Sequence, residues 1–181
     1  MASREIMAFI GRREGFVEVS YSDGKYLSWG FGHNGPEVLA GQRITLQDGI
    51  ALFSTDLERF ERGIKRELKA KLQPHEFDAL LSAAYNLGVN GVASVIELLN
   101  GGLRDAALKK LRSLCKIKSA DDGDPTTPPV FTESAGLKKR REAEAVLFET
   151  GDYGDVSRIP YWRNNPFKTK MEWVAFPDME K

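Results

Sequence analysis

The chain reads EGFVEVSYSDGKYLSWGFGH from Glu14 to His33. This stretch holds a carboxylate at Glu14, a second carboxylate at Asp23 nine positions later, and a hydroxyl at Ser28 five positions beyond. An inverting glycosidase holds a protonated carboxylic acid on one side of a glycosidic bond and a carboxylate that activates a water on the other. These residue types therefore suit glycoside hydrolysis with inversion, with Ser28 as a hydroxyl that helps to hold the water.

The hydrophobic pattern around this stretch predicts a short helix followed by a small hairpin. Apolar side chains from residue 3 to residue 15 recur on one face, and Gly15 then ends the helical pattern. From residue 16 to residue 31 the pattern becomes alternating and aromatic, and Ser22-Asp23-Gly24 interrupts it as a turn. We therefore expect Glu14 in the last turn of the helix and Asp23 at the turn of the hairpin.

Helical periodicity dominates the chain after residue 45. Thr45 can cap a long helix that begins at Leu46, and Pro74 begins a helix whose small residues permit close packing. After the long helix, the same periodicity predicts four more helices, at 74–87, 92–99, 103–115 and 137–150.

Two stretches lack this periodicity. Residues 118–136 are rich in aspartate and proline and are typical of an exposed loop. Residues 151–181 carry aromatic side chains among prolines and charges, and we expect an extended tail that packs over the helical lobe. The alternative is that its aromatic rings supply platforms for sugar stacking.

Length and charge are those of an ordinary globular domain. The chain has 181 residues, with 26 basic and 26 acidic side chains that leave a formal net charge of zero. A balanced charge disfavours a nucleic-acid partner. No apolar run is long enough to span a bilayer, so membrane insertion is not expected. The first residues lack the apolar stretch of a signal peptide, so we expect synthesis as a soluble protein in the cytoplasm.

Few residues of the chain are suited to redox or metal chemistry. Cys115 is the only cysteine, so it forms no intramolecular disulfide, and we expect it to act as a small apolar side chain. The two histidines, His33 and His75, are too few and too far apart to indicate a metal site. We expect no metal and no cofactor.

Three blocks of the chain, in this order, resemble the phage-type lysozyme family. The first is the stretch from Glu14 to His33, which closes on Gly-Phe-Gly-His. The second is QPHEFDALLSAAYNLG at 73–88, similar to the central helix of the family, and the third is GLKKRREAEAVLF at 136–148, similar to its late arginine-bearing helix. The resemblance implies an α+β, lysozyme-like fold in which a small β-hairpin lobe and a mainly helical lobe flank an active-site cleft.

The resemblance also implies a single domain over residues 1–181. Within it we expect the β-hairpin lobe at about 16–33, the helical lobe at about 1–15 and 45–150, and the aromatic C-terminal tail at 151–181.

The activity that the resemblance implies is that of a muramidase. Such an enzyme cleaves the β-1,4 bond between N-acetylmuramic acid and N-acetylglucosamine in bacterial peptidoglycan, with inversion. Carried over by position, Glu14 is the general acid, Asp23 orients or deprotonates the water, and Ser28 is the hydroxyl partner of that water. Family members usually have threonine at this last place, and the hairpin here is one residue shorter. Serine lacks β-branching, so its rotamer is less fixed.

Four further residues are expected to bind substrate or to orient the catalytic groups. We expect His33 to hold the hairpin through hydrogen bonds, and Arg140 to orient Glu14. Tyr85 and Asn86 would face the substrate from the central helix, where the amide can read acetamido or hydroxyl groups. Core packing explains Tyr85 equally well, and Arg140 with Arg141 could form only a solvated basic face.

The delivery route is left open by the sequence. The same chemistry suits a phage endolysin released through a holin pore, an antibacterial secretion-system effector whose partner is an immunity protein, and a phage tail lysozyme. In each case we expect a monomer that acts in the periplasm or cell wall. A hypothesis of another class is a non-hydrolytic peptidoglycan-binding module, which the short hairpin and Ser28 motivate.

Overall fold

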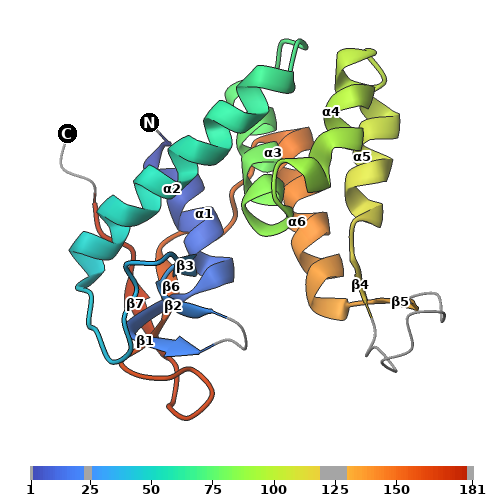
Figure 1. Ribbon diagram of the computed structural model, residues 1–181. Helices are drawn as coiled ribbons and strands as arrows, with labels where there is room; N and C mark the ends of the chain where they lie inside the picture. Colours follow the sequence, from blue (N-terminus) through green and yellow to red (C-terminus); the bar gives the residue numbers. More distant parts are fainter. Residues whose placement is uncertain (1, 23–25, 119–129, 179–181) are drawn as a thin grey trace. The chain divides into compact units, whose positions relative to one another are not determined.

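The computed structural model describes residues 2–22, 26–118 and 130–178 (Figure 1). The chain divides into two compact units: unit 1 comprises Met1–Arg62 and Tyr153–Lys181, and unit 2 comprises Gly63–Asp152. The boundary falls inside the helix α2 (Leu46–Glu67), between Arg62 and Gly63.

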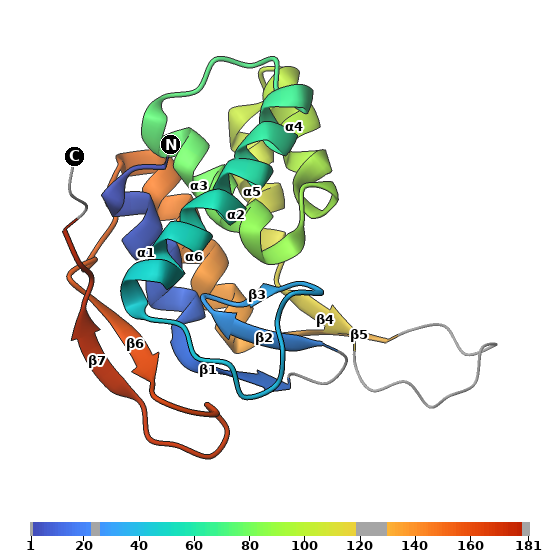
Figure 2. The same cartoon turned by 60° about the vertical axis from the view of Figure 1, so that its left-hand side comes forward.

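Unit 1 combines the helix α1 and the first part of α2 with a five-stranded sheet. The strands follow the order β3-β2-β1-β6-β7; β1 and β6 run parallel, and the other neighbours are antiparallel (Figure 2). The bounds are α1 Arg4–Glu14, β1 Phe16–Ser22, β2 Leu27–Gly30, β3 His33–Asn34, β6 Arg158–Trp162 and β7 Glu172–Ala175. The predictions of a helix before Gly15 and of a hairpin after it are confirmed.

The core of unit 1 is built around aromatic rings. Phe16 lies 5.3 Å from Phe31 and 5.2 Å from Tyr161, measured between ring centroids, and Phe31 stacks on Phe53 at 4.6 Å. Phe16, Phe31 and Phe53 are each at most 1% exposed. Such rings contribute a large share of the apolar area that folding removes from water.

The C-terminal tail is extended and packs against the helix α1, and it also adds two strands to the sheet, which was not expected from the sequence. Phe16 and Val17 of β1 pair with Tyr161 and Trp162 of β6, and β7 pairs with β6. This pairing satisfies backbone groups on the side of β1 that faces away from β2. It also buries Ile159, which is 0% exposed, so the tail is part of the sheet and of the core of unit 1.

Unit 2 is mainly helical. α3 packs against α6, and α5 packs against both α4 and α6. Besides the end of α2, its elements are α3 Pro74–Leu87, the 3₁₀ turn η1 Asn90–Val92, α4 Ala93–Asn100, α5 Arg104–Ser113, α6 Ala135–Thr150, and the strands β4 Lys116–Lys118 and β5 Phe131–Glu133. The predicted helices are confirmed to within a few residues at their ends.

Local sequence explains where the central helix α3 begins and ends. Pro74 occupies the first turn, where its missing N–H costs no hydrogen bond, and the Glu76 carboxylate accepts a 2.6 Å bond from the backbone N–H of Gln73. Gly88 ends the helix with a φ of 76°, a value that favours glycine.

The segment predicted as an exposed loop, 118–136, contains regular secondary structure at its described ends. Its flanks pair as the antiparallel strands β4 and β5, with Lys116 opposite Glu133. The prediction of an irregular loop is therefore wrong at these flanks, and residues 119–129 lie outside the described residues.

Two general features concern the described part of the chain as a whole. No helix in it combines the length and apolarity that a bilayer span requires. Its His, Cys, Asp and Glu side chains form no group of three or more that could hold a metal ion. Cys115 is buried, as expected, at 4% exposure.

Candidate active site

Glu14 is the last residue of α1, and the chain turns sharply after it. The N–H of Gly15 donates to the carbonyl of Gly11 at 2.8 Å, and Gly15 has a φ of 70°. A Cβ at Gly15 would lie 2.3 Å from a ring carbon of Trp162. Only glycine meets both conditions, so the backbone and the tail together fix the point at which Glu14 leaves the helix. Glu14 is half-buried, and its Oε1 is removed from solvent.

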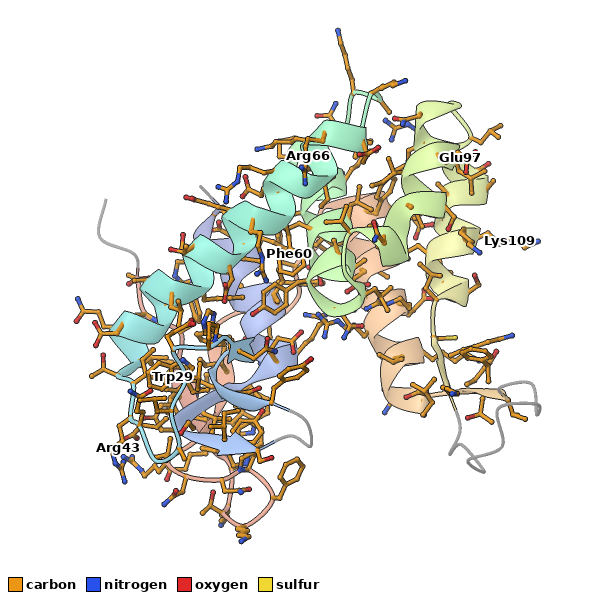
Figure 3. All side chains as sticks on the ribbon, viewed as in Figure 1. Trp29, Arg43, Phe60, Arg66, Glu97 and Lys109 are labelled. Carbon is orange, nitrogen blue, oxygen red and sulfur yellow. The ribbon has the colours of Figure 1, made fainter. Side chains whose placement is uncertain are left out.

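Glu18 is a second glutamate near this turn, on β1. Its carboxylate accepts a 2.7 Å bond from the Tyr161 hydroxyl and a 2.6 Å bond from Arg43, which is labelled in Figure 3. The hydrogen bond from Tyr161 lowers the pKa of Glu18, and Arg43 lowers it further, although burial acts in the opposite direction. Burial and Glu18 in turn raise the pKa of Tyr161 to about 12. Glu18 is therefore held ionised at neutral pH and is unsuited to donate a proton, which favours Glu14 as the acid.

The described part of the hairpin includes Ser28. Tyr21 and Ser22 at the end of β1 pair with Ser28 and Leu27 of β2. Ser28 is 1% exposed, so its hydroxyl is shielded from bulk solvent. Asp23 lies outside the described residues, and its role stays a prediction.

His33 connects the hairpin to α2. Its Nδ1 lies 2.8 Å from Oδ2 of Asp56, and its Nε2 lies 2.5 Å from Oε1 of Glu37. Burial lowers the pKa of His33, but the bonds to Glu37 and Asp56 outweigh this effect and raise it above the usual value of 6.5. The imidazolium between two carboxylates has the contacts expected of a residue that anchors the hairpin.

We expect the stability of the protein to depend on pH through His33. Because its folded pKa is raised, its contribution is complete below about pH 6.5, the unfolded value, and is lost as pH rises through the folded value. Urea unfolding between pH 5.5 and 8.5 should show this loss in the wild type, and His33→Gln should reduce the pH dependence. His75→Gln, which changes the other histidine, should keep it. An equal slope in His33→Gln and wild type would contradict this role.

A buried polar cluster joins α3 and α6 inside unit 2. Oε1 of Glu144 accepts a 2.7 Å bond from the Ser82 hydroxyl and a 3.2 Å bond from Nε of Arg140. Arg141 makes a 2.9 Å ion pair with Oε2 of Glu144, and its Nη2 donates to Oδ1 of Asn86 at 2.9 Å. Burial raises the pKa of Glu144, and the two guanidiniums and the Ser82 hydroxyl oppose that rise.

This cluster changes the interpretation of the two arginines. The Arg141 side chain is 0% exposed and that of Arg140 is 9% exposed, so the alternative of a solvated basic face is wrong. Ser82 and Glu144 were missed by the sequence analysis. The available signal was spacing: Glu144 follows the arginines by four and three residues on one helix, and Ser82 precedes Asn86 by four on another.

In unit 2, two of the predicted site residues lie in the same buried polar cluster. Asn86 and Arg140 are linked through Arg141 and Glu144, while Tyr85 is half-buried on α3. In unit 1, Glu14 lies at the start of the β1–β2 hairpin that carries Ser28, and β2 pairs with the strand that begins at His33.

A hollow of about 750 Å³ lies elsewhere in unit 2, between the end of α2 and α4. Both charge signs occur on its wall, including Arg66 and Glu97, which are labelled in Figure 3. The described residues that line it include none of the predicted site residues, so it is separate from the candidate active site.

The comparison with known families shows to which family the chain belongs. The family model for phage lysozyme matches residues 11–144, which include Glu14, the hairpin and the cluster around Glu144. The chain belongs to the phage lysozyme family. It is 34% identical to the endolysin of Bacillus phage B103 over 136 residues, which cover 74% of this chain and 47% of that relative. The chain spans about half the length of the Bacillus phage endolysins that it matches.

Solved structures share this fold. The endolysin from Escherichia coli O157:H7 phage FAHEc1 aligns with a TM-score of 0.74 at 24% identity, over 86% of this chain and 97% of that one. The muramidase domain of SpmX from Asticaccaulis excentricus aligns with a TM-score of 0.72 at 25% identity, over 83% and 98%. The α+β lysozyme-like fold predicted from the sequence is confirmed.

Proposed function

We propose that this phage lysozyme family member is a peptidoglycan hydrolase, a muramidase that cleaves the β-1,4 bond between N-acetylmuramic acid and N-acetylglucosamine with inversion. The observation that carries the proposal is the place of Glu14, fixed at the end of α1 by Gly15 and followed at once by the hairpin. Two sequence relatives are endolysins and one structural relative is a muramidase domain, which supports the same function.

Each of three side chains has one task in the proposed reaction. Glu14 donates its proton to the glycosidic oxygen as the bond from that oxygen to the anomeric carbon breaks. Asp23 accepts a proton from the water that attacks the anomeric carbon from the opposite face, so a new C–O bond forms with inverted configuration. Ser28 helps to hold this water. Proton exchange with solvent then restores Glu14 and Asp23.

The remaining site residues support this chemistry in the proposal. Asn86 uses its carbonyl oxygen as acceptor for Arg141, so its NH₂ group is the end that can donate to an acetamido or hydroxyl oxygen. Tyr85 and Asn86 are proposed to bind the sugar, His33 to anchor the hairpin, and Arg140 to orient Glu14. The single-domain organisation over 1–181 likewise stays a prediction.

Two measurements on purified peptidoglycan test the proposed activity. We expect the protein to lower turbidity and to release new reducing ends, and proton NMR of the first product should show the α-anomer. A β-anomer would contradict inversion. Binding to the wall with no more reducing ends than Glu14→Gln releases would instead support the non-hydrolytic module.

The biological setting that we propose is lysis by a phage endolysin that acts as a monomer on the bacterial cell wall. The endolysin relatives favour this setting over an injected effector or a tail lysozyme. A holin gene beside the coding gene would support it, whereas a neighbouring immunity gene or tail gene would favour one of the other two settings.

A further inference from the structure

The β6–β7 connection carries an exposed aromatic ring to the hairpin of the candidate active site. The Phe167 ring meets Tyr21 edge to face, with 6.0 Å between ring centroids and 73° between ring planes. Phe167 is 75% exposed, whereas the rings of the unit 1 core are buried. Tyr21 pairs with Ser28 across the hairpin and precedes Asp23 by two residues. A half-buried tyrosine and an exposed phenylalanine therefore meet on the strand that pairs with Ser28.

Hydrogen bonds of the connection hold Phe167 in this exposed position. The Asn165 side chain accepts a 2.9 Å bond from the N–H of Phe167, and the Asn165 carbonyl accepts bonds from the N–H groups of Lys168 and Thr169 at 3.0 and 3.1 Å. The Thr169 hydroxyl also donates to that carbonyl at 2.9 Å. Since most of its surface remains in water, Phe167 gains little from burial, and core packing does not explain its position.

The charges of this connection have one sign. From 163 to 171 the chain reads RNNPFKTKM, with three basic and no acidic residues. Arg163 is paired with Glu172 at 3.1 Å, while Lys168 and Lys170 are exposed on either side of Thr169. Peptidoglycan presents both the apolar C–H faces of its pyranose rings, which complement aromatic rings, and the carboxylates of its stem peptides, which attract ammonium groups.

We propose that Tyr21 and Phe167 form an aromatic subsite for the glycan strand of peptidoglycan, and that Lys168 and Lys170 meet the carboxylates of its peptides. This inference rests on the proposed muramidase function, because it extends the same site along the substrate. The tail strands β6 and β7 thereby serve binding as well as the core, since they carry the connection that holds Phe167.

The test compares Phe167→Ala with wild type on soluble, uncrosslinked glycan strands. We expect KM to rise about three- to tenfold with kcat unchanged, because stacking is lost in ground state and transition state alike. Phe167→Trp should restore KM, and the melting temperature of both variants should match wild type. Phe131→Ala is the matched control, since Phe131 is 57% exposed on β5 of unit 2. An unchanged KM in Phe167→Ala, or an equal rise in Phe131→Ala, would overturn the subsite.

The lysines are tested with the peptides as the variable. Lys168→Gln combined with Lys170→Gln should raise KM on strands that keep their peptides and leave it unchanged on strands whose peptide carboxylates have been converted to amides. An equal effect on both substrates would contradict the contact with peptide carboxylates. Wild-type protein that releases no reducing ends would overturn the muramidase function itself, which is a different result from an active wild type with an unchanged Phe167→Ala.

Discussion

Glu14→Gln is expected to lower the rate of reducing-end release from peptidoglycan by about a hundredfold to ten-thousandfold, the range over which general acids contribute. Glutamine keeps the size of the side chain at the end of α1 but has no proton that it can give to the glycosidic oxygen. Glu18 cannot take over this role, because the Tyr161 hydroxyl and Arg43 keep its pKa low. Initial rates at saturating substrate measure the loss, and circular dichroism and the melting temperature show whether the fold is retained.

The matched control is Glu5→Gln, which changes an exposed carboxylate in the first turn of the same helix. It removes the same charge from α1 but should leave the rate of reducing-end release unchanged. If Glu14→Gln retained the wild-type rate, another group would have to protonate the leaving oxygen, and the proposed assignment of Glu14 would fail.

The elements around Glu14 could be predicted because their signals are local. Ser3 caps α1 by accepting a bond from the N–H of Ile6, and Gly15 ends it twelve residues later with a conformation that favours glycine. Alternation and a turn sequence then specify the β1–β2 hairpin. Each of these features depends on neighbours in the sequence, so the single chain contains the information.

The place of the tail in the sheet could not be predicted, because its partner strand is remote in the sequence. β6 pairs in parallel with β1, which joins Phe16 to Tyr161 across most of the chain. No local pattern encodes such a partner, although the β-rich segments at 158–162 and 172–175, separated by a polar stretch with a proline, could have indicated a hairpin. Which edge of β1 is available to pair with β6 depends on how the rest of the sheet folds.

The candidate site shows the same division between local and remote information. Glu14, Ser28 and His33 belong to one continuous motif and could be assigned by resemblance. Asp56, which bonds His33, and Glu144, which organises the arginines, are brought to their partners by tertiary packing. Sequence spacing alone indicates that residues can share a helix face, but it does not indicate whether that face is buried.

The largest expected change in stability concerns the buried ion pair between Arg141 and Glu144 on α6. Arg141→Met should lower the free energy of unfolding by about 3 kcal/mol at neutral pH, because the buried Glu144 carboxylate keeps the Arg140 guanidinium but loses the fully buried Arg141 guanidinium. Both side chains of the pair are 0% exposed. Urea unfolding measures the loss. A combined Arg141→Met and Glu144→Gln variant should be more stable than Arg141→Met, since the buried carboxylate that lost one of its two guanidiniums is then neutral.

Two controls accompany this prediction: the same measurement at acid pH, and a variant that breaks an ion pair at the surface. Burial already raises the pKa of Glu144, and loss of the Arg141 guanidinium raises it further, so the folded variant binds a proton more readily than the unfolded chain. The loss of stability should therefore be largest above the folded pKa and should shrink as pH falls toward 4.5, the ordinary value. Arg112→Met breaks an ion pair with Glu142 in which the arginine is 35% exposed, and should cost less than about 1 kcal/mol. Equal losses in Arg141→Met and Arg112→Met would mean that Glu144 carries no charge in the folded protein.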